Sequence, residues 1–211
     1  MKVPDQYLKE IEQIPDIAKS PLEYVFEDLG VRQKKGELWL EFGVYKGSTI
    51  NYFSQFSSSQ VYGFDSFEGL PEDWRGPLKK GFFDTKGVMP EVRDNVVLIK
   101  GWFNQTLPHF IEQHKSETIS FIHIDCDLYS STKYVLDALK QMLKPGCVVV
   151  FDELVNYAGY EGDNGELRAW YEFICENDVD YDWLGMNGKI GMYKVDYEKA
   201  IVRINKISPR H

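Results

Sequence analysis

Apolar runs and amphipathic segments alternate along the chain from residue 37 onward. The runs "ELWLEFG", "QVYGFD", "NVVLIKG", "TISFIHID" and "CVVVFDE" are short, nearly continuous and rich in β-branched or aromatic residues, which is typical of strands buried on both faces. The segments 48–56, 106–114, 130–143 and 165–176 have the spacing of helices, and Pro145-Gly146 is expected to end the third. This alternation predicts an α/β fold with a parallel sheet covered on both faces.

The two ends of the chain depart from this alternation. Residues 6–14 and a segment that starts at Pro21, after Ser20, predict two short helices. We assign residues 1–36 to an N-terminal helical segment that caps the same domain, which spans 37–211. Near the other end, residues 181–195 form two strand-like runs joined by Asn187-Gly188, a hairpin signal. The sheet should therefore close with an antiparallel hairpin.

Composition narrows the class of protein. The chain has 211 residues, 43% apolar and 27% charged, as expected for a single globular domain. Its net charge of −9 argues against a nucleic-acid partner. No apolar stretch is long enough to span a bilayer, and the charged first residues do not form a signal peptide. The three cysteines are widely spaced and form no CxxC pair, so we expect reduced thiols in a soluble, cytoplasmic protein with no membrane partner.

The loop after the first predicted strand carries a weak ligand-binding signal. Gly43 and Gly47 are spaced GxxxG, unlike the GxGxxG of dinucleotide sites, and a simple tight turn is the alternative. Asp65 ends the second strand 22 residues after Gly43, where an acid can accept both ribose hydroxyls. Glu41 adds a negative charge that suits an ammonium or sulfonium group. S-adenosylmethionine fits this pattern better than NAD.

Acidic residues recur where the later strands end. "FIHIDCDLYSST" places Asp125 and Asp127 after one strand, and Asp152-Glu153 follow the next. Adjacent parallel strands would bring these carboxylates together, and a hard divalent cation such as Mg²⁺ would relieve their repulsion. Such a cation could lower the pKa of a bound hydroxyl. The alternative is that Asp125 and Asp127 cap the following helix, with His123 as a hydrogen-bonded core residue.

Several motifs resemble those of the macrocin O-methyltransferase family. "LEFGVYKGSTI", "YGFDSFEGLPEDW", "KGWFNQTLP", "FIHIDCDLYSST" and "VVVFDE" occur in that family's order, over roughly residues 37–195. The resemblance implies a class I methyltransferase: a Rossmann-like three-layer sandwich with a seven-stranded, mostly parallel sheet and a C-terminal antiparallel hairpin. It also implies S-adenosylmethionine as the methyl donor and Mg²⁺, or another hard divalent cation, as a cofactor.

The resemblance assigns roles residue by residue. The expected cofactor-binding residues are Glu41, Gly43, Tyr45, Gly47 and Ser48 of the first loop, Asp65 and Ser66 at the ribose, Gly101, Trp102 and Phe103 near the adenine, and Asp125. The expected metal ligands are Asp125, Asp152 and Glu153. The family usually has Asp-Asp where this chain has Asp152-Glu153, so the third ligand departs from the pattern. The catalytic base is expected to be Asp125 or Asp127, and the residues do not decide between them.

These expectations point to O-methylation of a sugar hydroxyl. The acceptor would be a glycan, a nucleotide sugar or a glycosylated natural product. A long loop with Trp74, Phe82 and Phe83 could form a lid, and Tyr157, Tyr160 and Glu166 could face the acceptor. One alternative is methylation of a catechol-type or other small-molecule hydroxyl, and another is a non-catalytic cofactor-binding module. The resemblance leaves a homodimer open.

Overall fold

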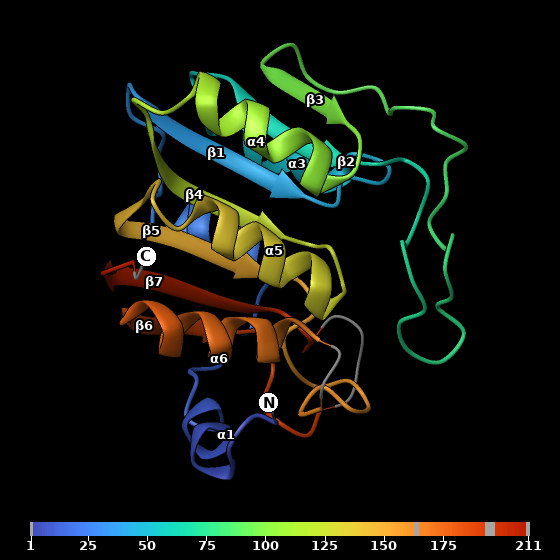
Figure 1. Cartoon of the computed structure of the whole chain (residues 1–211). Coiled ribbons are helices and arrows are strands. Elements are labelled where there is room, and N and C mark those ends of the chain that lie inside the picture. The colour runs from blue at the N-terminus through green and yellow to red at the C-terminus, as the bar shows by residue number, and fades with distance from the viewer. Residues whose placement is uncertain (1, 163–164, 193–196, 210–211) are drawn as a thin grey trace.

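The computed structural model describes residues 2–162, 165–192 and 197–209, and a seven-stranded sheet runs through it (Figure 1). Its strand order is β3-β2-β1-β4-β5-β7-β6. The strands are β1 Glu37–Phe42, β2 Val61–Asp65, β3 Val96–Lys100, β4 Thr118–Ile124, β5 Leu143–Phe151, β6 Asp180–Met186 and β7 Ala200–Lys206. The predicted fold class is confirmed.

The order of the strands creates one switch point. From β1 the chain steps outward to β2 and β3, then crosses back to β4 on the other side of β1. The loops that follow β1 and β4 therefore leave in opposite directions, and a cleft opens between them. Strands β1 to β5 pair in parallel, whereas β7 is antiparallel to both β5 and β6.

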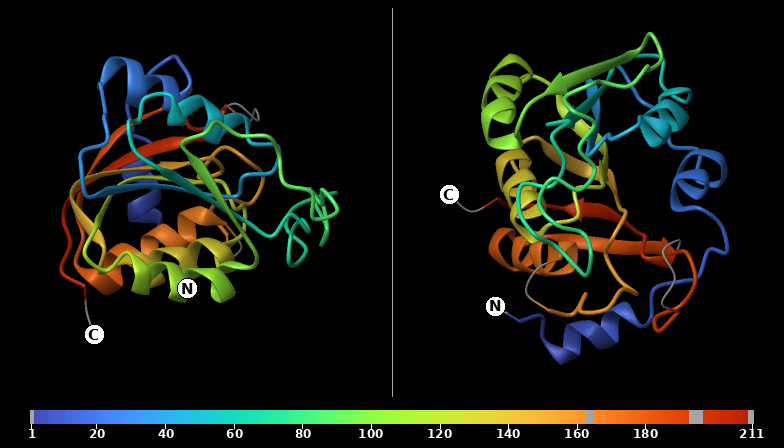
Figure 2. Two further views of the ribbon diagram at one scale, coloured as in Figure 1. Left: turned by 90° about the horizontal axis from the view of Figure 1, so that it is seen from above. Right: turned by 90° about the vertical axis from the view of Figure 1, so that its right-hand side faces the viewer.

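Helices cover both faces of the sheet (Figure 2). The helices are α1 Asp5–Ile11, α2 Pro21–Glu23 continued by the π-helix η1 Tyr24–Asp28, α3 Ser48–Ser54, α4 Phe103–Gln113, α5 Tyr129–Leu139 and α6 Glu166–Asn177. Helices α4, α5 and α6 lie side by side on one face, and α2, η1 and α3 lie on the other. Among the described residues, no helix is long and apolar enough to cross a membrane.

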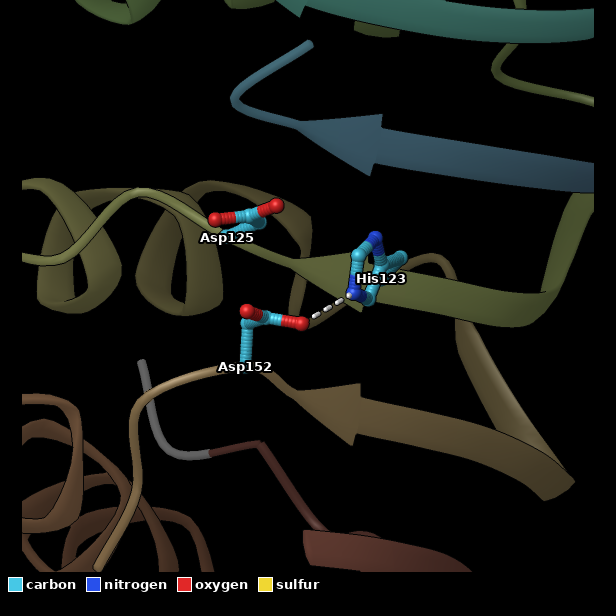
Figure 3. A group of neighbouring side chains, drawn as sticks. All are labelled: His123, Asp125 and Asp152. Carbon is cyan, nitrogen blue, oxygen red and sulfur yellow. Dashed lines mark hydrogen bonds and ion pairs between the residues drawn. The ribbon is translucent and has the colours of Figure 1, made fainter. Parts of the chain in front are cut away.

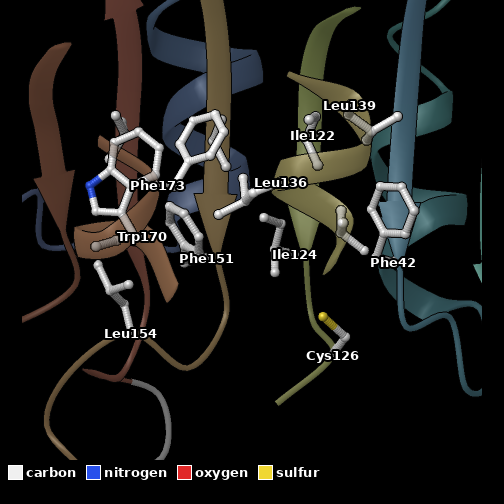
Figure 4. Close-up of a cluster of buried hydrophobic side chains, with 14 of the residues drawn as sticks. Phe42, Ile122, Ile124, Cys126, Leu136, Leu139, Phe151, Leu154, Trp170 and Phe173 are labelled. Carbon is white, nitrogen blue, oxygen red and sulfur yellow. The ribbon is translucent and has the colours of Figure 1, made fainter. Parts of the chain in front are cut away.

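The apolar strand residues divide into two cores, one on each face. Figure 4 shows the larger core, in which Phe42, Ile124 and Phe151 from three strands pack with Leu136 of α5 and Trp170 of α6, all fully buried. The smaller core gathers Phe26, Trp39 and Phe121 under η1 and α3, among other residues. Burial on both faces explains why these strands read as continuous apolar runs.

The predicted hairpin is right in its pairing and wrong in its second strand. β6 does pair antiparallel with a last strand, but that strand is β7, and the described part of the run after Gly188 has no strand structure. Residues 193–195 of that run lie outside the described residues. The N-terminal segment competes for the turn, since Met186 exchanges backbone hydrogen bonds with Pro15 and Ile17, and the Gly188 N–H donates to Asp16.

The predicted helix over 130–143 ends too late. α5 ends at Leu139, and Met142 and Leu143 already pair with Ile119 of β4. Pro145-Gly146 therefore lies inside β5, at an irregularity where its register with β4 shifts, and does not end the helix. Tertiary pairing of this segment outweighs its helical periodicity.

Candidate active site

Two of the predicted acids meet at the carboxyl edge of the sheet. Asp125 follows β4 and Asp152 follows β5, and the strands are in register where they end, with Ile124 opposite Phe151. The hydrogen-bond ladder continues past the strands, because the Asp152 N–H donates to Ile124 at 2.9 Å. One ligand atom each from Asp125, Asp152 and His123 lies within 4.8 Å of the others (Figure 3).

A buried network of hydrogen bonds and an ion pair holds the side chain of Asp152 in place. The His123 ring bonds to Glu41 Oε1 through Nδ1, at 2.8 Å, and to Asp152 Oδ1 through Nε2, at 3.3 Å. Lys199 forms an ion pair with the same Oδ1. Lys199 precedes β7, which is antiparallel to β5, so the start of β7 lies at the edge where β5 ends. This network fixes the orientation of the Asp152 carboxylate.

The charged side chains of this network stabilise one another. Burial alone would lower the pKa of His123, but its bonds to Asp152 and Glu41 raise that pKa to about 10, so the imidazole is a cation at neutral pH. Burial opposes ionisation of Asp152, yet the bond from His123 and the Lys199 charge hold its pKa below the ordinary value. Glu41 is fully buried, bonds to His123 and does not line the cavity described below.

Four other carboxylates in this region have no ion pair among the described residues: Asp125, Asp127, Glu153 and Glu166. Burial is the largest cause that raises the pKa of each, and neighbouring carboxylates add to it. The pKa of Asp127 rises to about 7. Glu153 Oε2 and Glu166 Oε1 are buried without a hydrogen-bond partner. Such a set favours either protonation or a bound cation.

The helix-capping alternative for Asp125 and Asp127 is wrong. Leu128 is the N-cap of α5, and no side chain caps that helix. Asp127 has a left-handed backbone with φ of 64°, a conformation that aspartate tolerates better than most residues. Its side chain is 6% exposed and lines the cavity.

The pKa shifts predict how the metal-free protein responds to pH. Carboxyl groups with raised native-state pKa values stabilise the fold below their unfolded-state pKa of about 4, and this contribution is lost as the pH rises through their native-state pKa values, which for Asp127 is about 7. His123 also has a raised pKa, so its stabilising contribution is likewise lost as the pH rises, but only near pH 10. In a chelator, the free energy of unfolding should fall by on the order of 3 kcal/mol between about pH 5 and about pH 8. Thermal or urea unfolding across this range measures it, and a flat or rising stability would contradict it.

A cavity of about 690 Å³ opens beside the acids at the switch point. Of the expected site residues, the structure brings Gly43, Tyr45, Asp65, Ser66, Gly101, Trp102, Phe103, Asp125, Asp127 and Glu153 to its wall. The wall does not include Glu41, Gly47, Ser48 or Asp152; Gly47 is the N-cap of α3 and Ser48 begins that helix. Apart from these four, the residues proposed for the cofactor, the cation and the base share one cleft.

Asp65 organises the end of this cavity that the glycine loop forms. Its Oδ2 accepts the N–H groups of Val44 and Tyr45 at 2.8 Å each, and its Oδ1 accepts that of Phe67 at 2.7 Å. A carboxylate has about four acceptor positions, so one lone pair or more remains for a ligand hydroxyl. Sequence reasoning gave Asp65 a ligand role alone, whereas the structure adds a second role in holding the glycine loop.

Gly43 is needed because the loop runs very close to β4. Its φ is +90°, and a Cβ there would lie 1.7 Å from the Asp125 carbonyl oxygen. The glycine loop and Asp125, a proposed metal ligand, are thus in direct backbone contact. Any side chain at this position would push them apart.

The long loop after Ser66 forms part of the wall. Phe83 lines the cavity and packs on Tyr45, with ring centroids 5.4 Å apart. Elsewhere in this loop, away from the cavity wall, the Arg75 guanidinium lies between the rings of Trp74 and Tyr157, 4.1 and 4.2 Å from their centroids, and pairs with Glu198 through both terminal nitrogens. Phe82 is 44% exposed, while Tyr157, Tyr160 and Glu166 are buried rather than open to an acceptor.

Several residues of the site were not predicted. The cavity wall includes Leu70 and Pro71 of the long loop, Asn104 and Gln105 of α4, Cys126, and Ser130, Ser131 and Tyr134 of α5. The α5 residues follow the acid-bearing segment directly, so their position after a parallel strand was a usable signal. Lys199 had no motif, and only the antiparallel direction of the last strand indicates where it lies.

Comparison with known proteins supports the same fold. Residues 40–154 match the family model described as "Methyltransferase domain". The chain is 28% identical over 159 residues to the 8-demethyl-8-(2,3-dimethoxy-α-L-rhamnosyl)-tetracenomycin-C 4'-O-methyltransferase of Streptomyces olivaceus. That match covers 63% of this chain and 58% of the relative's length.

Solved structures with similar folds are methyltransferases as well. The calicheamicin methyltransferase CalS11 has a TM-score of 0.58 at 23% identity, over 86% of this chain and 75% of that one. An O-methyltransferase from Bacillus cereus, solved in complex with SAH (S-adenosylhomocysteine), has a TM-score of 0.55 at 18% identity, over 97% and 92%. At these identities the likeness shows the fold. Because the family model matches more than half of the chain, this protein belongs to the methyltransferase-domain family.

Proposed function

We propose that this protein transfers a methyl group from S-adenosylmethionine to a sugar hydroxyl, with the help of a bound divalent cation. The observation that carries the proposal is the convergence of Asp125, Asp127 and Glu153 on a cavity that Gly43 and Asp65 also line. A donor site and an acidic site in one cleft are what methylation of a hydroxyl requires.

The donor end of the cavity suits a nucleoside without phosphates. Asp65 offers a carboxylate for ribose hydroxyls, and Trp102 and Phe103 offer apolar surface for a purine. The wall formed by these residues includes no lysine or arginine that would pair with a pyrophosphate. S-adenosylmethionine supplies the electrophilic methyl group when bound.

The acidic end suits a hard divalent cation. Asp125 and Asp152 offer oxygens within 4.8 Å of each other, whereas Glu153 lies outside that close group with one buried oxygen unpartnered. Both nitrogens of His123 are engaged, so the available donors are carboxylate oxygens, which Mg²⁺ or Mn²⁺ prefers over Zn²⁺. A cation bound here would supply Lewis acidity and lower the pKa of an acceptor hydroxyl.

Asp127 is the proposed general base. Asp125 lies next to Asp152 and is used in the cation site, which leaves Asp127 as the neighbouring carboxylate on the cavity wall. Its pKa of about 7 matches the requirement for a group that accepts a proton at neutral pH. Asp127 takes the hydroxyl proton as the acceptor oxygen attacks the methyl carbon. The products are the methyl ether and S-adenosylhomocysteine.

The sugar acceptor rests on the relatives. The Streptomyces olivaceus enzyme is named for methylation of a rhamnosyl group, and the motifs around Asp65 and Asp125 resemble the macrocin O-methyltransferase family.

The protein is tested with a panel of nucleotide sugars and glycosides against a panel of catechols, in Mg²⁺ and in chelator. Transfer to sugars that requires Mg²⁺ supports the proposal. Transfer to catechols alone assigns the other acceptor class, and binding of S-adenosylhomocysteine without transfer to any acceptor indicates a non-catalytic module.

We expect the Asp125→Asn variant to bind Mg²⁺ more weakly and to be more stable in the absence of the cation. Loss of one carboxylate ligand should weaken Mg²⁺ binding at least about 100-fold, since even partners outside the ligand set contribute 10- to 100-fold. In a chelator the same variant should be more stable than the wild type, because one of several mutually repelling carboxylates is neutralised. Calorimetric Mg²⁺ titration and thermal unfolding measure the two effects. A variant that is destabilised in chelator and binds Mg²⁺ normally would remove Asp125 from the cation site.

A further inference from the structure

Glu166 is a buried carboxylate that no part of the proposed reaction uses. It is the first residue of α6 and is 0% exposed. Its Oε2 accepts the N–H of Glu153 at 3.3 Å, while its Oε1 has no hydrogen-bond partner. A carboxylate oxygen buried in this way needs a proton or a cation to offset the loss of hydration.

Glu166 begins α6 at the point where this helix packs against the segment that follows β5. Gly165 precedes it, and a Cβ on Gly165 would lie 1.9 Å from the Tyr157 hydroxyl, so the helix begins in close contact with the segment after β5. The charges of Asp127 and Asp152 both act on Glu166, which places its carboxyl group in the same electrostatic cluster. Glu166 therefore approaches the cluster from a helix, whereas the proposed ligands come from strand ends.

The positive groups nearby are already paired. Arg75 binds Glu198 through two hydrogen bonds, and His123 and Lys199 bind Asp152. Among the described residues none of these cations pairs with Glu166 or with Glu153. The two glutamates adjoin through the backbone bond, and each has one buried oxygen unpartnered.

We propose that Glu166 is a fourth carboxylate ligand of the divalent cation, beside Asp125, Asp152 and Glu153. This inference rests on the cation site of the proposed function. Glu166 lies outside the 4.8 Å group of Asp125 and Asp152, so its side chain, which has three rotatable bonds, would have to turn toward the cation to bind it. The structure offers an alternative role, in which Glu166 only holds the Glu153 peptide through Oε2.

The Glu166→Gln variant separates the two roles, because glutamine keeps an oxygen for the Glu153 N–H but lacks the charge. Glu176→Gln, an exposed position on the same helix, is the matched control. Titration with Mg²⁺ alone, without donor or acceptor, should show an affinity at least about 100-fold weaker in Glu166→Gln, beyond the 10- to 100-fold of a partner outside the ligand set, and no change in Glu176→Gln. Wild-type affinity in Glu166→Gln overturns the proposal while leaving the cation site in place.

A measurement on the unmodified protein gives an independent test. If Glu166 binds the cation, Mg²⁺ should slow hydrogen exchange of the backbone amides in the first turns of α6, which a cation held by strand ends alone would not do. Unchanged exchange there in the presence of bound Mg²⁺ overturns the proposal. A wild-type protein that binds no Mg²⁺ overturns both this inference and the cation part of the proposed function.

Discussion

The Asp127→Asn variant is expected to turn over about 10² to 10⁴ times more slowly than the wild type, the usual contribution of a positioned general base. Asparagine keeps the shape of the side chain but cannot accept the hydroxyl proton. The binding of S-adenosylhomocysteine should change little, because Asp65 and the glycine loop it holds, which we propose as the ribose site, are unaltered. The loss should therefore appear in kcat, measured at saturating donor and acceptor.

The control is Asp137→Asn, a change of the same kind on the exposed side of α5 that should leave kcat unaltered. Thermal unfolding of Asp127→Asn in chelator should show a stability equal to or above that of the wild type, since a carboxyl group with a raised pKa is replaced by a neutral amide. If Asp127→Asn retains a kcat within about threefold of the wild type, Asp127 is not the base.

The Asp65→Ala variant is expected to lose at least about 100-fold in affinity for S-adenosylhomocysteine. A hydrogen bond to a charged group contributes about 1.5–3 kcal/mol, and Asp65 keeps an acceptor position for a ribose hydroxyl. The variant also leaves the N–H groups of Val44, Tyr45 and Phe67 without their acceptor, so the glycine loop should loosen. Calorimetry measures the affinity, and hydrogen exchange of residues 43–47 measures the loop.

Asp94→Ala, at an exposed position before β3, serves as the control and should bind the ligand normally. Circular dichroism should show that Asp65→Ala keeps its secondary structure, because Asp65 lies at the end of β2 and not in either core. An Asp65→Ala protein that is folded and binds S-adenosylhomocysteine as tightly as the wild type would exclude Asp65 from the ribose site.

The sheet could be predicted where burial alone determined the pattern. Runs such as Val61–Asp65 and Thr118–Ile124 are buried on both faces and gave nearly the observed strands. The prediction was wrong where long-range contacts compete with local signals. Asn187-Gly188 favours a tight hairpin locally, but Asp16 accepts the N–H of Gly188, Pro15 accepts that of the preceding Met186, and the partner strand comes from Ala200–Lys206.

In the candidate site, too, residues placed by the strand pattern could be predicted, and residues placed by long-range contacts could not. Acids at the ends of parallel strands must lie at one edge of the sheet, so the proximity of Asp125 and Asp152 could be foreseen from their positions alone. Glu41 could not be placed, because its strand is correct but its side chain turns onto His123 rather than into the cavity. Lys199, just before β7, pairs with Asp152, and Glu166, at the start of α6, accepts the N–H of Glu153; no local pattern indicates contacts of this kind.

The central claim is that carboxylates from neighbouring strand ends hold a divalent cation beside the methyl donor. Anomalous diffraction from crystals grown with S-adenosylhomocysteine and Mn²⁺ tests it most directly. The account predicts one strong manganese peak bonded to Asp125 and Asp152, in the cavity whose far wall holds the ribose on Asp65. Well-defined S-adenosylhomocysteine on Asp65 with no manganese at these carboxylates would contradict it.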